Sequence, residues 1–191
     1  MNNLGVVAVL AALGIAGCQE PPVAAAPEPT PAARTGLPSS AAFGVVFDHA
    51  NGLETRPCDG AMPRCTILFD PAAEEFMRDL LTVQVHAGSL ETVAAAEAGF
   101  ERDAGGRLMT TYGRFEPVPV EAFEVNGQSG LRAVVTCGIS DPETGFHAAA
   151  GECLWAVVSD GAQSVVISSS GFGNGLEAAE AAVRTIRFTA D

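Results

Sequence analysis

Lysine is missing from this 191-residue sequence, and all ten of its basic residues are arginine. Acidic residues number 23, so the formal net charge is −13. A surface this acidic repels nucleic acid and anionic lipid head groups. The charge therefore argues against a nucleic-acid partner and against a domain that lies flat on a membrane.

Recognisable catalytic motifs are also missing. The sequence contains neither the G-x-S-x-G turn of α/β-hydrolases nor an S-x-x-K pattern. Residues 170–175 are rich in glycine but match neither common phosphate-binding pattern, and we expect a connector with Asn174 near a helix cap. Within it, Phe172 is expected to fold back on the core rather than to anchor a partner. We therefore predict no enzymatic activity and no cofactor.

The residues that could still carry chemistry are scattered. A metal site would require the histidines to converge with Asp48, Glu74 or Glu75, and a Ser-His-Asp triad would require similar convergence through folding. Solvated surface side chains are the favoured interpretation, with no catalytic and no metal-binding residues. This applies to three histidines and two acidic pairs: His49, His86, His147, Glu74 with Glu75, and Glu121 with Glu124.

The N-terminal apolar run, residues 4–15, is too short to span a bilayer as a helix. It ends in Ile15-Ala16-Gly17-Cys18, and an apolar core followed by small residues is typical of a cleaved secretory signal. The motif resembles the lipobox of bacterial lipoproteins. That resemblance implies that Cys18 is lipidated, with palmitate among the acyl groups, and becomes the first residue of the mature chain.

The expected domain organisation follows from this motif. Residues 1–17 are interpreted as the signal peptide, and residues 18–42 as the lipidated cysteine and a disordered tether rich in proline and alanine. Residues 43–191 are long enough for a single globular domain. The predicted location is the cell envelope. With Gln19 after the cysteine, the resemblance favours the outer membrane, facing the periplasm, in a Gram-negative organism.

Four further cysteines, an even number in an exported chain, indicate disulfides. Three pairings are possible. Local context favours Cys58 with Cys65 and Cys137 with Cys153, since each pair flanks a loop between strand-like segments. Zinc binding would require closer C-x₂₋₄-C pairs than these spacings provide.

Alternating apolar residues and Asn-Gly or Asp-Gly dipeptides predict a series of strands joined by turns. Helical spacing of apolar residues predicts two helices, at residues 90–102 and 176–187. The second carries Glu180 and Arg184 as an i,i+4 pair. The expected strands are residues 43–47, 53–58, 65–69, 81–85, 118–125, 131–139, 153–159 and 162–169.

The central strands can be aligned by their cysteines. If Cys137 lies opposite Cys153, then Val135 faces Trp155, and the Asp160-Gly161 turn places Val166 beside the same tryptophan. Both faces of such a sheet are apolar, so both must be covered. The predicted fold class is α/β (α+β), a mostly antiparallel sheet sandwiched by two helices, with Trp155 largely buried.

This order of elements resembles the PsbP/Mog1-like family. The resemblance rests on the strand at residues 81–85 leading into the helix, on the turn within residues 125–132, on the strands around Trp155 and Val166, and on the terminal Ile186-Arg187-Phe188. It implies a non-catalytic binding or accessory domain. The expected partners are the membrane, through the anchor, and a protein or small ligand at the envelope. An envelope hydrolase with a dispersed site and a purely structural envelope protein remain as alternatives.

Overall fold

A computed structural model describes residues 37–60, 62–110, 116–141 and 146–189, with the side chains of 139–141 and 146–150 excepted. Cys18 and the predicted signal lie outside these residues. Within the described ranges, no helix is both long and apolar enough to cross a bilayer.

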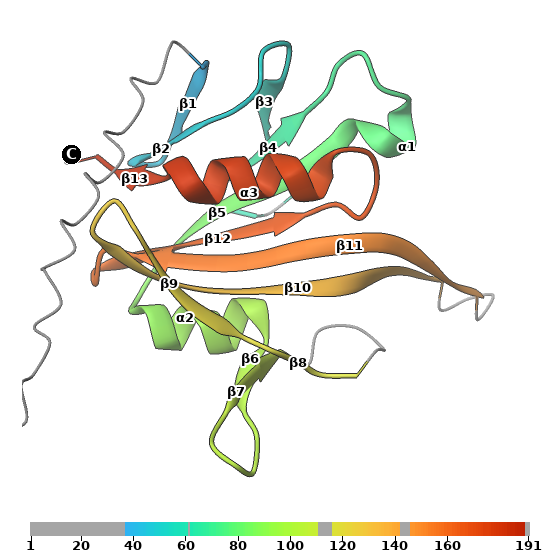
Figure 1. Cartoon of the computed structure of the whole chain (residues 1–191). Helices are drawn as coiled ribbons and strands as arrows, with labels where there is room; N and C mark the ends of the chain where they lie inside the picture. The colour runs from blue at the N-terminus through green and yellow to red at the C-terminus, as the bar shows by residue number, and fades with distance from the viewer. Residues whose placement is uncertain (1–36, 61, 111–115, 142–145, 190–191) are drawn as a thin grey trace, which may run out of the picture. The chain divides into compact units, whose positions relative to one another are not determined.

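Seven antiparallel strands form the central sheet, in the order β3-β4-β5-β12-β11-β10-β9 (Figure 1). At one end, the long β10–β11 ribbon extends beyond both neighbouring strands, β9 and β12. The strands are β3 (Glu54–Pro57), β4 (Cys65–Phe69), β5 (Asp79–Ala87), β9 (Glu121–Val125), β10 (Gln128–Asp141), β11 (Phe146–Ser159) and β12 (Gln163–Ser169).

Two helices cover opposite faces of this sheet, α2 (Leu90–Ala98) and α3 (Gly175–Thr185), and Figure 1 shows the strands between them. Short elements complete each side. A three-stranded sheet adjoins the end of α3, another lies beside α2, and a single-turn helix joins β4 to β5. These elements are β1 (Ser39–Ala42), β2 (Val45–Asp48), β13 (Arg187–Phe188), β6 (Phe100–Arg102), β7 (Leu108–Thr110), β8 (Val118–Pro119) and α1 (Glu75–Arg78).

The predicted two-sided core is confirmed. Alternation along the strands directs one set of side chains toward α3 and the other toward α2. The α3 set includes Phe47, Leu68, Leu154, Val165, Ile167 and Ile186. The α2 set includes Val93, Phe100, Ala133, Val135, Val157 and Val166. The predicted fold class, a mostly antiparallel sheet between helices, is therefore correct.

Both predicted registers in the central strands are wrong by two residues. Val135 lies opposite Cys153 and Ala133 opposite Trp155, with a bulge between Thr136 and Gly138. Val157, rather than Trp155, pairs with Val166. A shift of two residues returns each side chain to the same face of the sheet, because side chains alternate with a period of two. The predicted core faces were therefore right although the registers were not.

The β11–β12 turn explains the second shift. The Asp160 side chain accepts hydrogen bonds from the backbone N–H groups of Ala162 and Gln163, each at 2.9 Å. An aspartate that binds the backbone two residues ahead stands at the first position of a turn. Gly161 and Ala162 are thus the central turn residues, one step later than predicted.

The α2 helix ends earlier than predicted. Gly99 adopts a left-handed conformation (φ 61°), and its N–H binds Ala94 O. Such a glycine cap stops a helix. The residues that follow form strand β6, which places Phe100 in the core as a strand residue. Ala96, which has the helical spacing of the apolar stripe predicted for residues 90–102, is exposed.

The beginning of the fold also differs from the prediction. Phe43 and Gly44, expected inside the first strand, both have positive φ and form the turn between β1 and β2. β1 (Ser39–Ala42) pairs with β2, although its four residues belong to the segment assigned to the tether. Ser39 Oγ donates to Asp48 Oδ1 at 2.7 Å, which adds a side-chain link to this pairing.

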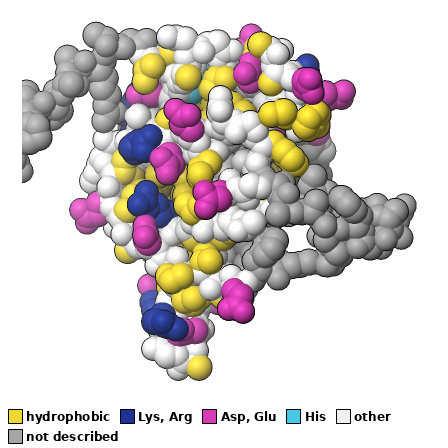
Figure 2. Space-filling view, turned by 45° about the vertical axis from the view of Figure 1, so that its right-hand side comes forward, with side chains coloured by type: hydrophobic (Ala, Val, Ile, Leu, Met, Phe, Trp, Pro, Cys, Tyr) yellow, Lys and Arg dark blue, Asp and Glu magenta, His cyan; other side chains and the backbone are white. Residues whose placement is uncertain are grey.

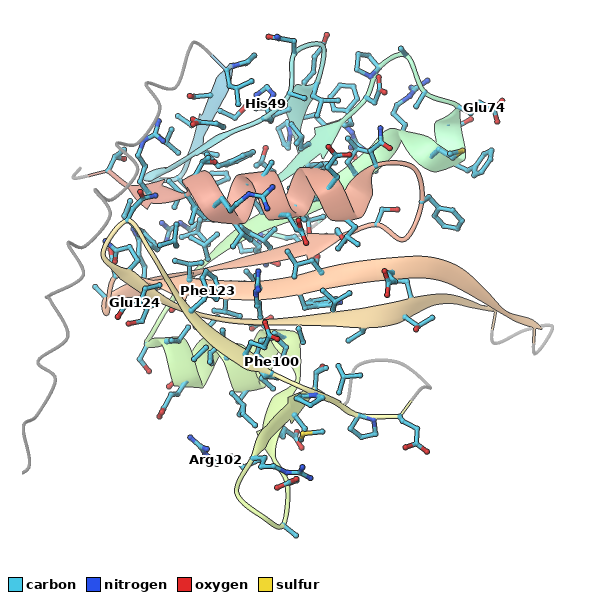
Figure 3. All side chains as sticks on the ribbon, in the orientation of Figure 1. His49, Glu74, Phe100, Arg102, Phe123 and Glu124 are labelled. Atoms are coloured by element: carbon cyan, nitrogen blue, oxygen red, sulfur yellow. A yellow bond between two sulfur atoms is a disulfide. The ribbon has the colours of Figure 1, made fainter. Side chains whose placement is uncertain are left out.

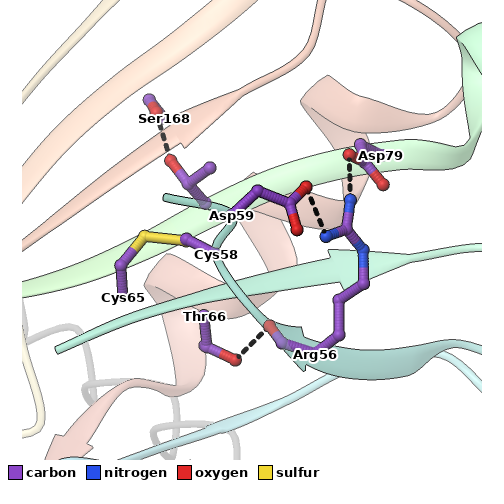
Figure 4. The surroundings of a disulfide bond; sticks show 8 residues. Arg56, Cys58, Asp59, Cys65, Thr66, Asp79 and Ser168 are labelled. Carbon is purple, nitrogen blue, oxygen red and sulfur yellow. Dashed lines mark hydrogen bonds and ion pairs between the residues drawn. A yellow bond between two sulfur atoms is a disulfide. The ribbon is translucent and has the colours of Figure 1, made fainter. Parts of the chain in front are cut away.

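Both predicted cysteine pairs lie at disulfide distance. The Cα atoms of Cys58 and Cys65 are 5.4 Å apart at the β3–β4 loop, as Figure 4 shows. Those of Cys137 and Cys153 are 5.6 Å apart beside the bulge of β10. The bulge brings Cys137 next to Cys153 even though the two are not register partners.

Candidate functional site

An aromatic pair lies exposed beside the short helix α1. The Phe76 side chain is 66% exposed, the largest value among the large hydrophobic residues that the structure describes. Its ring meets that of Phe172 edge to face, with centroids 6.2 Å apart. Phe172, from the β12–α3 connector, is half-buried, so it packs against another surface aromatic rather than folding into the core as predicted.

Two acidic residues precede Phe76 in the chain. Glu74 and Glu75 are exposed next to Phe76, whereas Arg78 at the end of α1 is partly buried. In the space-filling view, hydrophobic side chains gather at the upper right, on the side where α1 lies, with acidic side chains around them (Figure 2). We call Phe76, Phe172, Glu74 and Glu75 the α1 surface. It combines an apolar centre with a negative rim.

Close packing fixes the connector that carries Phe172. Ser170 N–H donates to Leu80 O at 2.7 Å, and a Cβ on Gly175 would stand 2.8 Å from the same carbonyl oxygen. Any side chain at Gly175 would therefore push the start of α3 away from β5. The glycine-rich segment allows the backbone at the start of α3 to lie close to that of β5. The same packing holds Phe172 in a defined position.

A cavity of about 400 Å³ opens beside α2. Its walls are mostly apolar and come from four elements, α2, β6, β7 and β10. The apolar lining consists of Leu90, Ala94, Ala95, Phe100, Leu108 and Leu131, and Glu91, Glu101 and Arg102 stand at the rim. Figure 3 shows Phe100 below the sheet and Arg102 farther out. We call this space the α2 cavity.

His49 is buried, which corrects the prediction of a solvated surface histidine. Its side chain is 6% exposed. Nδ1 lies 3.0 Å from Ala50 O, and Nε2 lies 3.0 Å from Ser40 Oγ. A carbonyl can only accept, so Nδ1 carries a proton, and Nε2 shares the second hydrogen bond with the serine hydroxyl. These bonds fasten β1 to the end of β2.

His86 also differs from the prediction, because it is mostly buried under α2. Nδ1 lies 3.6 Å from Glu97 Oε1, and the His86 side chain is 17% exposed. Its Nε2 is buried without a hydrogen-bond partner among the described residues. His147 belongs to β11, but its side chain lies outside the described set. The described parts of the three histidines therefore do not converge.

Unlike His49 and His86, the two acidic pairs are solvated, as predicted. Glu121 and Glu124 are exposed on β9, and Glu121 Oε2 accepts from Arg132 Nη2 at 3.1 Å. Among the described residues, no group of three or more His, Cys, Asp or Glu side chains could hold a metal ion.

Two charged groups have shifted pKa values. A hydrogen bond to Asp59 raises the pKa of Arg56, with Asp79 contributing, and Figure 4 shows both carboxylates on its guanidinium. In the β6–β7 loop, the backbone N–H of Arg107 lowers the pKa of Asp103, whose carboxylate also accepts from Gly105 N–H. Both groups stabilise loops and lie away from any reactive constellation.

Phe76 and the α2 cavity were missed by sequence reasoning. Phe76 could have been noticed, because it is an aromatic residue directly after two acids and belongs to no predicted strand or helical stripe. The cavity leaves a weaker trace in the sequence, the neighbouring Ala94 and Ala95, since alanine side chains cannot fill the space next to a neighbouring hairpin.

No family model matches the chain, and no curated protein is similar to it in sequence. Several solved structures are similar in fold. One is the solution structure of cyanobacterial PsbP (CyanoP) from Synechocystis sp. PCC 6803, at 15% identity, with 82% of this chain and 96% of that one covered and a TM-score of 0.47.

Another is a crystal structure from Bacteroides thetaiotaomicron VPI-5482, at 7% identity and a TM-score of 0.46. The match covers 78% of this chain and 46% of that one, so the chain spans about half of its length.

Proposed function

We propose that this chain is an exported, lipid-anchored accessory protein whose folded domain binds a protein partner at the cell envelope without catalysing a reaction. The observation that carries this proposal is the exposed Phe76 ring, which packs on the half-buried Phe172 at the surface. Large apolar side chains that stay in water at one place on a surface are typical of contact sites, and aromatic residues dominate such sites energetically.

The α1 surface also indicates what kind of partner would fit. Glu74 and Glu75 give the aromatic centre a negative rim on a chain of net charge −13. Complementary charge increases the rate and specificity of association. The partner would therefore offer an apolar surface that packs against the two rings, with arginine or lysine residues around it.

Site-specific photo-cross-linking in cells tests this function. A benzophenone amino acid replaces Phe76, and a matched variant carries it at Phe43, which is 45% exposed on the β1–β2 turn. We expect one discrete protein adduct from position 76 and none from position 43. Equal adducts from both positions, or none from either, would contradict a partner site at the α1 surface.

The anchor is tested separately. Ile15-Ala16-Gly17-Cys18 supports lipidation of Cys18, and stable anchoring requires two acyl chains or a second membrane signal. Mass spectrometry of the membrane fraction is expected to show a mature chain beginning at an acylated Cys18, and Cys18→Ala is expected to release the protein. A chain that keeps Met1 and stays out of the membrane fraction would refute the anchor.

One observation favours a hydrolase as the second candidate. Ser40, His49 and the Ala50 carbonyl form a hydroxyl–imidazole–acceptor chain with 3.0 Å at each step, which is the geometry of an activated serine. Ser40→Ala removes the hydroxyl with little change in packing. If the variant folds but no longer supports the protein's function in cells, the hydrolase hypothesis replaces the accessory one. We expect the function in cells to be retained.

A further inference from the structure

The α2 cavity has the size and lining of a small-molecule site. Ligand pockets commonly measure about 300–1,000 Å³ and are lined mainly by apolar side chains with a few polar groups. This cavity has a volume of about 400 Å³ and six apolar lining residues. It is separate from the α1 surface, since none of its lining residues belongs to α1 or to the β12–α3 connector.

The sequence of α2 explains why the space is open. Ala94 and Ala95 face the β6–β7 hairpin where longer side chains would fill the gap, while Phe100, 2% exposed, forms a fixed wall. Apolar surface at such a site gains free energy when an apolar ligand group displaces water from it. The cavity therefore suits a hydrocarbon group.

The charged residues at the rim favour a ligand with a positive head group. Glu91 and Glu101 are exposed, and neither forms an ion pair with another described residue. Arg102 is the only cation at the rim within the described part of the chain, and its Nη1 donates to Gly106 O at 3.0 Å in the hairpin turn. The two carboxylates thus remain available to a positive head group, at the mouth of a cavity in a strongly acidic chain.

We propose that the α2 cavity binds a cationic amphiphile, with its hydrocarbon part against Ala94, Ala95 and Phe100 and its positive group between Glu91 and Glu101. Anionic amphiphiles with the same tail bind more weakly, because the rim carboxylates repel them. Opposite charges at such a rim interact through water, so the preference declines as salt is added.

Three probes with one tail and three head groups test the proposal by calorimetry: decyltrimethylammonium, decyl maltoside and decyl sulfate, each below its micelle concentration. The protein is the full chain carrying Cys18→Ser, so that no acyl anchor competes. We expect decyltrimethylammonium to bind at least about tenfold more tightly than decyl sulfate, with decyl maltoside between them. Equal affinities, or tighter binding of the sulfate, would overturn the proposal.

Two neighbouring alanines give a matched pair of variants. Ala95→Trp fills the cavity and is expected to weaken binding of decyltrimethylammonium at least tenfold. Ala96→Trp places the same ring on the same helix away from the cavity and is expected to bind as wild type. Both positions are exposed, so both variants are expected to fold. Wild-type affinity in Ala95→Trp, or an equal loss in both, would refute the site.

Two further measurements separate the head group from the tail. Glu91→Gln with Glu101→Gln is expected to abolish the preference for the cation while decyl maltoside still binds; a retained preference would overturn the role of the rim. Amide shifts in the full Cys18→Ser chain, without further substitution, are expected to change most at Ala94, Ala95, Phe100 and Leu131. Largest changes at residues 4–15 would mean that the probe binds the N-terminal apolar run instead.

Discussion

The two faces of the central sheet are built differently. The α3 face packs large aliphatic and aromatic side chains, including Phe47, Leu154 and Ile167, against a helix of 11 residues. The α2 face meets a helix of nine residues that is rich in alanine, and it leaves the α2 cavity between that helix and the β6–β7 hairpin. A smaller cavity, of about 270 Å³, also opens beside α3, so the two faces differ in the amount of open space rather than in whether they have any.

The largest expected contrast is between two leucines on neighbouring strands. Leu154 is fully enclosed on the α3 face, so Leu154→Ala is expected to lower the free energy of unfolding by about 2–5 kcal/mol. Leu131 is half-buried at the α2 cavity, and Leu131→Ala is expected to cost about 1 kcal/mol. Urea denaturation measures both. Equal losses would mean that the α2 face is packed as tightly as the α3 face.

The disulfides give the next largest effect. Replacing Cys137 and Cys153 together by serine is expected to cost about 3 kcal/mol, and replacing Cys58 and Cys65 about 2.5 kcal/mol, because the separations of 16 and 7 residues close loops of different length in the unfolded chain. Non-reducing peptide mapping establishes the linkages first. A Cys58–Cys137 peptide, or four free thiols after export, would contradict the pairing.

Filling the cavity is expected to have a smaller, stabilising effect. Ala95→Leu adds apolar volume at the open face of α2 and is expected to raise the free energy of unfolding by about 0.5–1 kcal/mol. Ala96→Leu, the matched control, is expected to stay within about 0.5 kcal/mol of wild type. Thermal unfolding of both variants checks the pair. A destabilised Ala95→Leu would show that the space is narrower than the structure indicates.

The smallest expected effect is local and depends on pH. The backbone N–H of Arg107 lowers the pKa of Asp103 below its ordinary value of 3.8. A lowered pKa means that the ionised carboxylate stabilises the β6–β7 loop. That stabilisation is complete above the ordinary pKa and disappears as the pH falls through the lower folded-state value. The amide shifts of Gly105 and Arg107 are expected to report this midpoint, and Asp103→Asn to abolish it; a midpoint above 3.8 would contradict it.

Some of the differences between prediction and structure have a common cause. Strand existence, the apolar faces and the turn at Asn126-Gly127 followed from local pattern, and Gln128 pairs with Val125 as a two-residue turn requires. The registers around Trp155 did not follow from local pattern. A bulge or a displaced turn shifts the pairing by two residues, and such a shift leaves every side chain on the same face, so alternation cannot detect it. Trp155 itself is partly buried and packs against the α2 core, which agrees with its predicted place in the core.

The candidate sites could be predicted only in part. The neighbouring Ala94 and Ala95 are visible in the sequence, but the cavity exists because Gly99 ends α2 early and turns Phe100 into a strand residue facing them. His49 illustrates the same limit. Its neighbours in the chain suggested a surface turn, whereas its burial depends on Ser40, which β1 brings beside it.

Alternating apolar residues are a local property, and they were enough to specify an antiparallel sheet that is apolar on both faces and covered by two helices. The N-terminal motif and the cysteine spacing are equally local, and they support the predictions of an anchor at Cys18 and of two disulfides. Contacts between distant segments decided the rest. Phe76 meets Phe172 across 96 positions of chain, and Ala95 faces Leu131, because packing depends on which surfaces the complete fold brings together.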